Sequence, residues 1–171
     1  MFQKGDSVVY GNLGVCKIND LVTRQFEGLD EAHPYYVLKP LYQESVLYVP
    51  ADNPKIALRA VLTADEANQL IDSIPSLHGE AFHSRSAQEL AAHYEESLKT
   101  HDCKDLLELA MSIYEKKQSL TRQNKKFGRA DEHFMRQAEE NLYGELAAAL
   151  NIPKESVPDY IQQRINAHTT A

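Results

Sequence analysis

The stretch that decides the fold of the first part of the chain is FQKGDSVVYGNLGVCKINDLVTRQF, residues 2–26. Two glycines, Gly11 and Gly14, stand between two runs rich in β-branched residues. A phosphate-binding loop would need a helix directly after the second glycine, because the helix N-terminus faces the anion. Here VCKI follows, which is typical of a strand. We therefore expect a turn between paired strands, with positive φ at both glycines.

Two separate short strands are indicated at VCKIND (15–20) and LVTRQF (21–26), and further ones at PYYVLKP (34–40), VLYVP (46–50) and LRAVL (58–62). Turn-forming residues separate them, among them Glu27-Gly28 and YQES. A small sheet would expose unpaired edges, and closing it into a barrel removes them. The first 62 residues therefore predict a small closed or nearly closed β-barrel.

The pattern becomes helical after Leu62. Thr63 and Glu66 have the spacing of a capping box at the start of a helix. Asp102 is a candidate N-cap for a second helix, in which Leu106, Leu109 and Ile113 fall on one apolar face together with Ala110. The helices we expect span 64–74, 86–99, 104–117, 130–151 and 156–168. The predicted fold is α+β with two domains, a β-barrel over 1–62 and an all-α helical bundle over 63–171.

Composition excludes several classes of protein. No run of apolar residues is long enough to span a membrane, and the start of the chain lacks the pattern of a secretory signal, which favours a cytoplasmic protein. The two cysteines lie far apart, and neither CxxC nor HExxH occurs, so we expect no disulfide, no metal and no cofactor. The sequence shows no nucleophile–base constellation, so we expect neither an enzyme nor a small-molecule substrate.

One basic cluster, residues 114–136, stands out in a chain whose net charge is −7. It holds seven basic residues and three acidic ones, which is the charge pattern expected of phosphate contact. The alternative is a solvated helix end, where lysine is favoured by the helix dipole. The basic residues are Lys116, Lys117, Arg122, Lys125, Lys126, Arg129 and Arg136.

The N-terminal residues also form a specific pattern. Phe2, Gly5-Asp6, Val8-Val9-Tyr10 and Gly14-Val15 precede Arg24, and then come YYVLKP (35–40) and YVPADN (48–53). In this combination the segment resembles the N-terminal domain of the CarD/CdnL family of bacterial transcription regulators. The same module occurs in transcription-repair coupling factor, which also carries a large helicase that this chain is too short to hold. This match covers about the first sixty residues, and the helical remainder fits the family by its order and by the stretches SLKTHDCKDLLELA (97–110) and ENLYGELA (140–147).

The resemblance implies a Tudor-like or SH3-like barrel that binds the β subunit of RNA polymerase, and a helical domain that contacts promoter DNA. Arg24 corresponds to an arginine that the family uses on the polymerase. A second basic position of that contact falls at or beside Tyr48, so this contact is altered here. The alternative is that neither residue contacts the polymerase. Arg24 would then be a solvated strand residue and Tyr48 a partly buried aromatic residue of a strand.

The resemblance is weaker on the DNA side. Family members of the best-known type insert a tryptophan into the minor groove beside an arginine, whereas this chain has no tryptophan. The corresponding position falls near Ala87, and Phe82, His83 and Arg85 lie close by as candidate substitutes. The alternative is a surface loop before a helix that is capped at Ser84 or Ser86.

Two functions remain open at this point. The first is a regulator that tethers polymerase to promoter DNA and changes the stability of the open promoter complex. The second is a polymerase-binding adaptor whose helices do not engage DNA. It is favoured by the missing tryptophan and by the acidic excess of residues 63–171, which hold twelve Lys and Arg against eighteen Asp and Glu.

Overall fold

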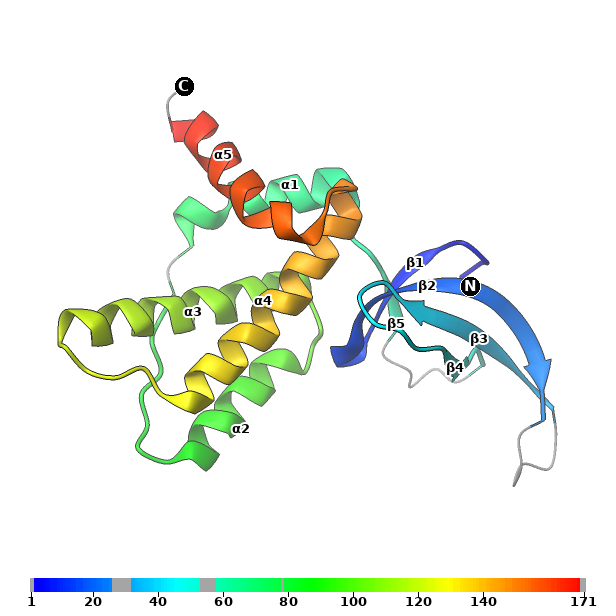
Figure 1. Cartoon of the computed structure of the whole chain (residues 1–171), viewed down its shortest axis with the longest axis horizontal. Coiled ribbons are helices and arrows are strands. Elements are labelled where there is room, and N and C mark those ends of the chain that lie inside the picture. Colours follow the sequence, from blue (N-terminus) through cyan, green and yellow to red (C-terminus); the bar gives the residue numbers. More distant parts are fainter. Residues whose placement is uncertain (1, 26–31, 53–57, 78, 170–171) are drawn as a thin grey trace. The chain divides into compact units, whose positions relative to one another are not determined.

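The structure is a computed structural model that describes residues 2–25, 32–52, 58–77 and 79–169. It divides into two compact units, Met1–Val61 and Leu62–Ala171 (Figure 1). The first is a sheet and the second consists of helices. The predicted order of a β part and a helical part is thus confirmed.

The sheet unit is one antiparallel five-stranded sheet in the order β4-β3-β2-β1-β5 (Figure 1). Strand β1 pairs with β2 and β5, and β3 pairs with β2 and β4. No pairing between β4 and β5 occurs among the residues that the structure describes, so closure into a barrel stays a prediction. The strands are β1 Ser7–Tyr10, β2 Gly14–Arg24, β3 His33–Pro40, β4 Leu47–Pro50 and β5 Leu58–Ala60.

The core of this unit follows from the alternation of side chains along the strands. Val8 lies opposite Cys16, and Ile18 lies opposite Leu38, and all four side chains are at most 1% exposed. Tyr36 and Val49 complete this cluster. Burial raises the pKa of the Cys16 thiol to about 11, because the interior disfavours the thiolate.

The glycine turn is confirmed, with φ of 47° at Gly11 and 89° at Gly14. A short 3₁₀ turn, Gly11–Leu13, joins β1 to β2. The predicted break between two strands near residue 20 is wrong, because β2 is continuous. It carries a register shift between Ile18 and Asp20, where a bulge lets one strand keep pairing with β3. The predicted turn at Glu27-Gly28 lies outside the described residues.

The helical unit contains five α-helices within the described range 62–77 and 79–169. They are α1 Ala64–Asp72, α2 Ala87–Leu98, α3 Cys103–Arg122, α4 Arg129–Leu150 and α5 Val157–Thr169. Two 3₁₀ turns, Ile74–Ser76 and Lys154–Ser156, precede the 78–86 segment and α5. None of these helices is apolar enough over a sufficient length to cross a membrane.

The start signals of the helices are confirmed. Thr63 and Glu66 form a complete capping box at α1, and Asp102 accepts a hydrogen bond from the backbone N–H of Lys104 at α3. Ser86 caps α2 through the N–H of Glu89. Helix α3 ends at Arg122, five residues beyond the C-terminal end of the predicted 104–117 helix. Its last turn therefore carries part of the basic cluster.

The predicted apolar faces form the core of the helical unit. Leu106, Leu109 and Ile113 of α3 pack in one cluster with Phe134 and Leu142 of α4. Tyr94 of α2 and Val157 of α5 join the same cluster and are at most 1% exposed. Polar contacts fasten α5 to α1, since Arg164 makes a bidentate ion pair with Asp72. That ion pair raises the pKa of Arg164.

A buried carboxylate fixes the point where the chain enters the helical unit. Glu145 of α4 is 1% exposed, and its Oε2 accepts a hydrogen bond of 3.1 Å from the backbone N–H of Leu62. A buried charge is tolerated where such donors are available. Leu62 is therefore held against α4 and not left as a loose linker residue.

Candidate functional site

Arg24 and Tyr48, which the sequence singles out separately, lie together in the structure. Arg24 is at the end of β2 and Tyr48 is on β4, and the guanidinium carbon of Arg24 is 5.1 Å from the centre of the tyrosine ring. Tyr48 is 40% exposed, so this cation–π pair is on the surface. The pair combines a preorganised cation and an apolar ring, as protein–protein interfaces often do.

Exposed apolar side chains also occur in the connection that leads into β4. Leu41, Tyr42 and Val46 lie in the connection between β3 and β4 and are 43%, 46% and 54% exposed. Among the described residues, β4 is also the last strand at one end of the sheet. An edge strand offers unpaired backbone groups to a partner strand, and apolar neighbours add contact area. This part of the sheet unit can therefore receive a protein partner.

In the structure, some residues of the basic cluster are paired with carboxylates and others are not. Two of its members are paired with exposed acids, Arg122 with Glu115 at 3.6 Å and Arg136 with Glu132 at 3.3 Å. No ion pair is recorded within the described ranges for Lys125, Lys126 or Arg129, nor for Arg85 of the segment before α2. These four cations, like Lys117 of the cluster, make no ion pair within the described residues and remain for an external anion.

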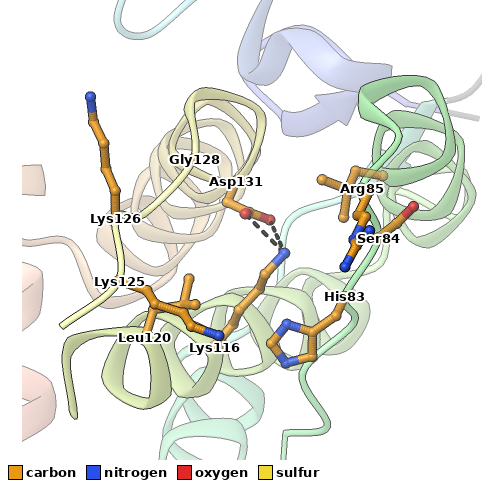
Figure 2. Close-up of a pocket in the computed structure, with 10 residues that line it drawn as sticks. His83, Ser84, Arg85, Lys116, Leu120, Lys125, Lys126, Gly128 and Asp131 are labelled. Carbon is orange, nitrogen blue, oxygen red and sulfur yellow. Dashed lines mark hydrogen bonds and ion pairs between the residues drawn. The ribbon is translucent and has the colours of Figure 1, made fainter. Parts of the chain in front are cut away.

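Three of the four line one groove (Figure 2). Arg85 comes from the segment before α2, whereas Lys125 and Lys126 come from the connection between α3 and α4. The groove has a volume of about 630 Å³, and His83 and Ser84 also contribute to its wall. Residues that are forty positions apart in the sequence thus form one basic hollow.

The floor of the groove is a buried polar network. The ammonium group of Lys116 contacts the two carboxylate oxygens of Asp131 at 3.0 and 2.9 Å, and the two side chains are 6% and 4% exposed. Tyr94 donates a hydrogen bond of 2.5 Å to the same carboxylate. Burial, together with the adjacent Asp131, raises the pKa of Tyr94. The network joins α2, α3 and α4 beneath the hollow.

Lys116 therefore differs from its predicted role. The sequence counts it among the surface cations, but its side chain is buried and its charge is matched by Asp131. It packs inward because the buried face of α3 continues through this position. Asp131 and Tyr94 were not predicted as site residues, because a partner fifteen or more positions away leaves no local signal in the sequence.

A second hollow on the α3–α4 hairpin has a different charge balance. Lys117, with its ammonium 5.5 Å from the centre of the Phe127 ring, lines it with Arg136, Glu132 and Glu139. Two cations thus face two carboxylates. Burial raises the pKa of Glu139, and Lys117 opposes that shift. Lys117 is consequently a poorer candidate for phosphate contact than Lys125.

The candidate substitutes for the missing tryptophan are also separated. Phe82 packs against the helical core, and its ring stacks on His93 with 3.8 Å between ring centres. His83 and Arg85 line the groove instead. Within the described residues, no group of three or more His, Cys, Asp or Glu side chains is placed to hold a metal ion.

Comparison with known proteins finds a family match for the first unit. No curated protein matches the chain at a significant level. Residues 2–62 match the family described as CarD-like/TRCF RID domain, a range that contains the whole five-stranded sheet together with the Arg24–Tyr48 pair. The sheet unit of this chain is therefore similar to the CarD-like domains that interact with RNA polymerase.

Proposed function

We propose that this protein is a transcription regulator that binds the β subunit of RNA polymerase through its sheet unit and promoter DNA through its helical unit. The observation that carries the proposal is the match of residues 2–62 to the CarD-like/TRCF RID domain. An RNA polymerase-interacting, transcription-related protein is the part that this match supports directly. The choice of subunit and the contact with DNA are our inference.

The surface of the sheet unit supports the polymerase contact. The Arg24–Tyr48 pair and the apolar β3–β4 connection lie beside an edge strand, which suits docking by strand addition. We keep the small Tudor-like barrel as the proposed form of this unit, because a small barrel still exposes some main-chain edge to a partner. We further propose that the protein is cytoplasmic and acts without an enzymatic step of its own.

The mechanism we propose is differential affinity for two states of the promoter complex. A protein that binds the open complex more tightly than the closed one shifts the equilibrium by the difference in binding free energy. About 1.4 kcal/mol corresponds to a tenfold shift. Cations of the helical unit would supply part of that difference if more phosphates come within reach in the open complex.

The second candidate is the polymerase-binding adaptor whose helices do not engage DNA. It is favoured by the acidic excess of the helical residues and by the pairing of Lys116, Arg122 and Arg136 with carboxylates. The lifetime of an open promoter complex separates the two candidates. The full chain with Arg85, Lys125 and Lys126 changed to Glu is compared with the full chain carrying Lys117→Glu.

A regulator loses its effect on the lifetime in the triple variant and keeps it in the Lys117→Glu control. An adaptor shows no difference between the two proteins. Retention of the β subunit by the unaltered chain is measured in parallel, and failure of this retention would remove both candidates.

A further inference from the structure

The groove carries more positive charge than its own acid can balance. Arg85, Lys116, Lys125 and Lys126 line it, and Asp131 is the one carboxylate among its lining residues. In Figure 2, Arg85 and Lys125 lie to either side of the Lys116–Asp131 pair, whereas Lys126 extends away from the other labelled side chains. Cations that converge on a hollow without a matching acid favour an anionic ligand.

The buried floor has a hydrogen-bond donor left for that ligand. An ammonium group carries three N–H donors. The two carboxylate oxygens of Asp131 account for two of those on Lys116, and no further acceptor for this group is recorded in the described part of the chain. Lys116 is 4% exposed and lines the groove. Its third donor is therefore in position to meet a ligand oxygen in the hollow.

The N-terminus of α4 lies at the same groove. Gly128, the N-cap residue, lines the groove and provides no side-chain hydrogen bond to the first turn of this 22-residue helix. The first backbone N–H groups of a helix need acceptors from outside it, and the dipole makes this end attractive to anions. At α1, α2 and α3 a side chain supplies that acceptor.

The second hollow shows that this arrangement is specific to the groove. There Lys117 and Arg136 face Glu132 and Glu139, so the charges of the lining balance. It lies on the same α3–α4 hairpin and is also hollowed, with a volume of about 450 Å³. A basic hairpin alone therefore does not produce an excess of cations in a cavity.

We propose that the groove is a site for one phosphate group, clamped between Arg85 and Lys125 above the third donor of Lys116. A volume of about 630 Å³ also accommodates the sugar and base attached to such a phosphate, since small-molecule sites measure roughly 300–1,000 Å³. The phosphate belongs either to a DNA backbone or to a free nucleotide. The proposal rests on the proposed function only for the DNA source.

The test is a titration of the full chain with inorganic pyrophosphate and with ADP at constant ionic strength, followed by the amide resonances of residues 128–131. We expect saturable shifts of these resonances. Lys125→Gln and Arg85→Gln should each weaken the binding of the probe about tenfold, which is the size of a lost charged hydrogen bond. Lys117→Gln, the matched control one residue from Lys116, should leave it unchanged.

The role of Lys116 is tested in the double variant Lys116→Met/Asp131→Asn, which avoids an unpaired buried charge and keeps an acceptor for Tyr94. We expect a folded protein that binds pyrophosphate at least tenfold more weakly. Shifts that do not saturate, or that decline equally in Lys117→Gln, would overturn the site.

A short DNA duplex added to the pyrophosphate complex identifies the source of the phosphate. Displacement of the probe from residues 128–131 assigns the groove to the DNA backbone, and binding of ADP without displacement by DNA assigns it to a free nucleotide. If the polymerase is not retained but the shifts of residues 128–131 are still seen, the proposed function is refuted and the groove is not. Loss of the shifts with retention intact would remove the groove alone.

Discussion

The guanidinium of Arg24 lies over the ring of Tyr48, 5.1 Å from its centre, and joins the end of β2 to the edge strand β4 across β3. The two residues are not paired in the register of the sheet, so the contact is made by the side chains alone. An exposed cation–π contact contributes about 0.5–1 kcal/mol to folding. Its larger effect is to hold the arginine in one orientation before a partner arrives.

We expect Arg24→Ala and Tyr48→Ala each to weaken retention of the polymerase about tenfold, and the double variant to lose little more than either. The reason is that each substitution removes the same oriented pair. A binding titration on immobilised β subunit gives the three values. Lys17→Ala, on the same strand, is the control and should bind normally. Fully additive losses would show that the two residues act independently.

The Lys116–Asp131–Tyr94 network predicts a marked asymmetry between single and double substitutions. Asp131→Ala leaves the lysine charge buried and should lower the free energy of unfolding by about 3–5 kcal/mol. Lys116→Met/Asp131→Leu removes both charges and should cost much less. Urea denaturation measures both, with Lys117→Met as the exposed control. A double variant as unstable as Asp131→Ala would contradict this account.

The salt dependence of DNA binding should reflect the cations that have no acidic partner. With Arg85, Lys125, Lys126 and Arg129 on phosphates, the log–log slope is expected to be roughly −3.6, at about 0.9 per neutralised phosphate. Lys125→Gln should reduce its magnitude by about 0.9. Arg136→Gln should not, because Glu132 already pairs with Arg136. A slope near zero for the unaltered chain would favour the adaptor.

Gly79 is the residue that lets the segment before α2 approach α3. A Cβ there would lie 2.7 Å from the backbone carbon of Met111, and the adjacent Glu80 carbonyl accepts a hydrogen bond from Ser112. Gly79→Ala should therefore push this segment outward, destabilise the protein by about 1–3 kcal/mol and weaken ligand binding at Arg85. Gly128→Ala, whose Cβ meets only Asp131 Oδ2 at 3.5 Å, should cost less, about 0.5 kcal/mol, because alanine is only a poorer N-cap residue there. Thermal denaturation of both variants makes the comparison, and equal losses would contradict it.

The Cys16 thiol predicts a loss of stability in alkali. Burial raises its pKa from 9.0 to about 11, so the folded state keeps the proton that the unfolded state releases. The stabilisation is complete below about pH 9 and is lost as the pH rises toward about 11. We expect the free energy of unfolding to fall over this window and Cys16→Ala to flatten the fall. Urea denaturation at about pH 8 and about pH 10.5 measures it, and parallel pH profiles would contradict it.

The sequence predicts the fold well where local signals and periodicity agree. The capping box at Thr63, the cap at Asp102 and the apolar face of α3 all appear in the structure where the spacing puts them. The split of β2 was wrong because a bulge lets polar Asp20 pass without ending the strand. A bulge depends on the partner strand and therefore leaves no clear mark in the strand itself.

The site was only partly predictable for a related reason. Charge counting found Lys125 and Lys126, but it could not separate them from Lys116 or Arg122. Whether a lysine is buried against an aspartate or open to a groove depends on which helices pack together, and these contacts span fifteen to thirty-seven positions. Arg24 and Tyr48 were found one at a time, and only the order of the strands, with β3 between β2 and β4, shows that their side chains can meet.

Helix α4 holds both Glu145, which grips the backbone at Leu62, and Asp131, which lies beneath the groove. The two positions are fourteen residues apart, or about 21 Å along a continuous helix. A displacement of the backbone at Leu62 therefore acts on the same continuous helix whose other end forms part of the groove wall. The hydrogen bond from the Leu62 N–H to Glu145 keeps this residue from moving independently of α4.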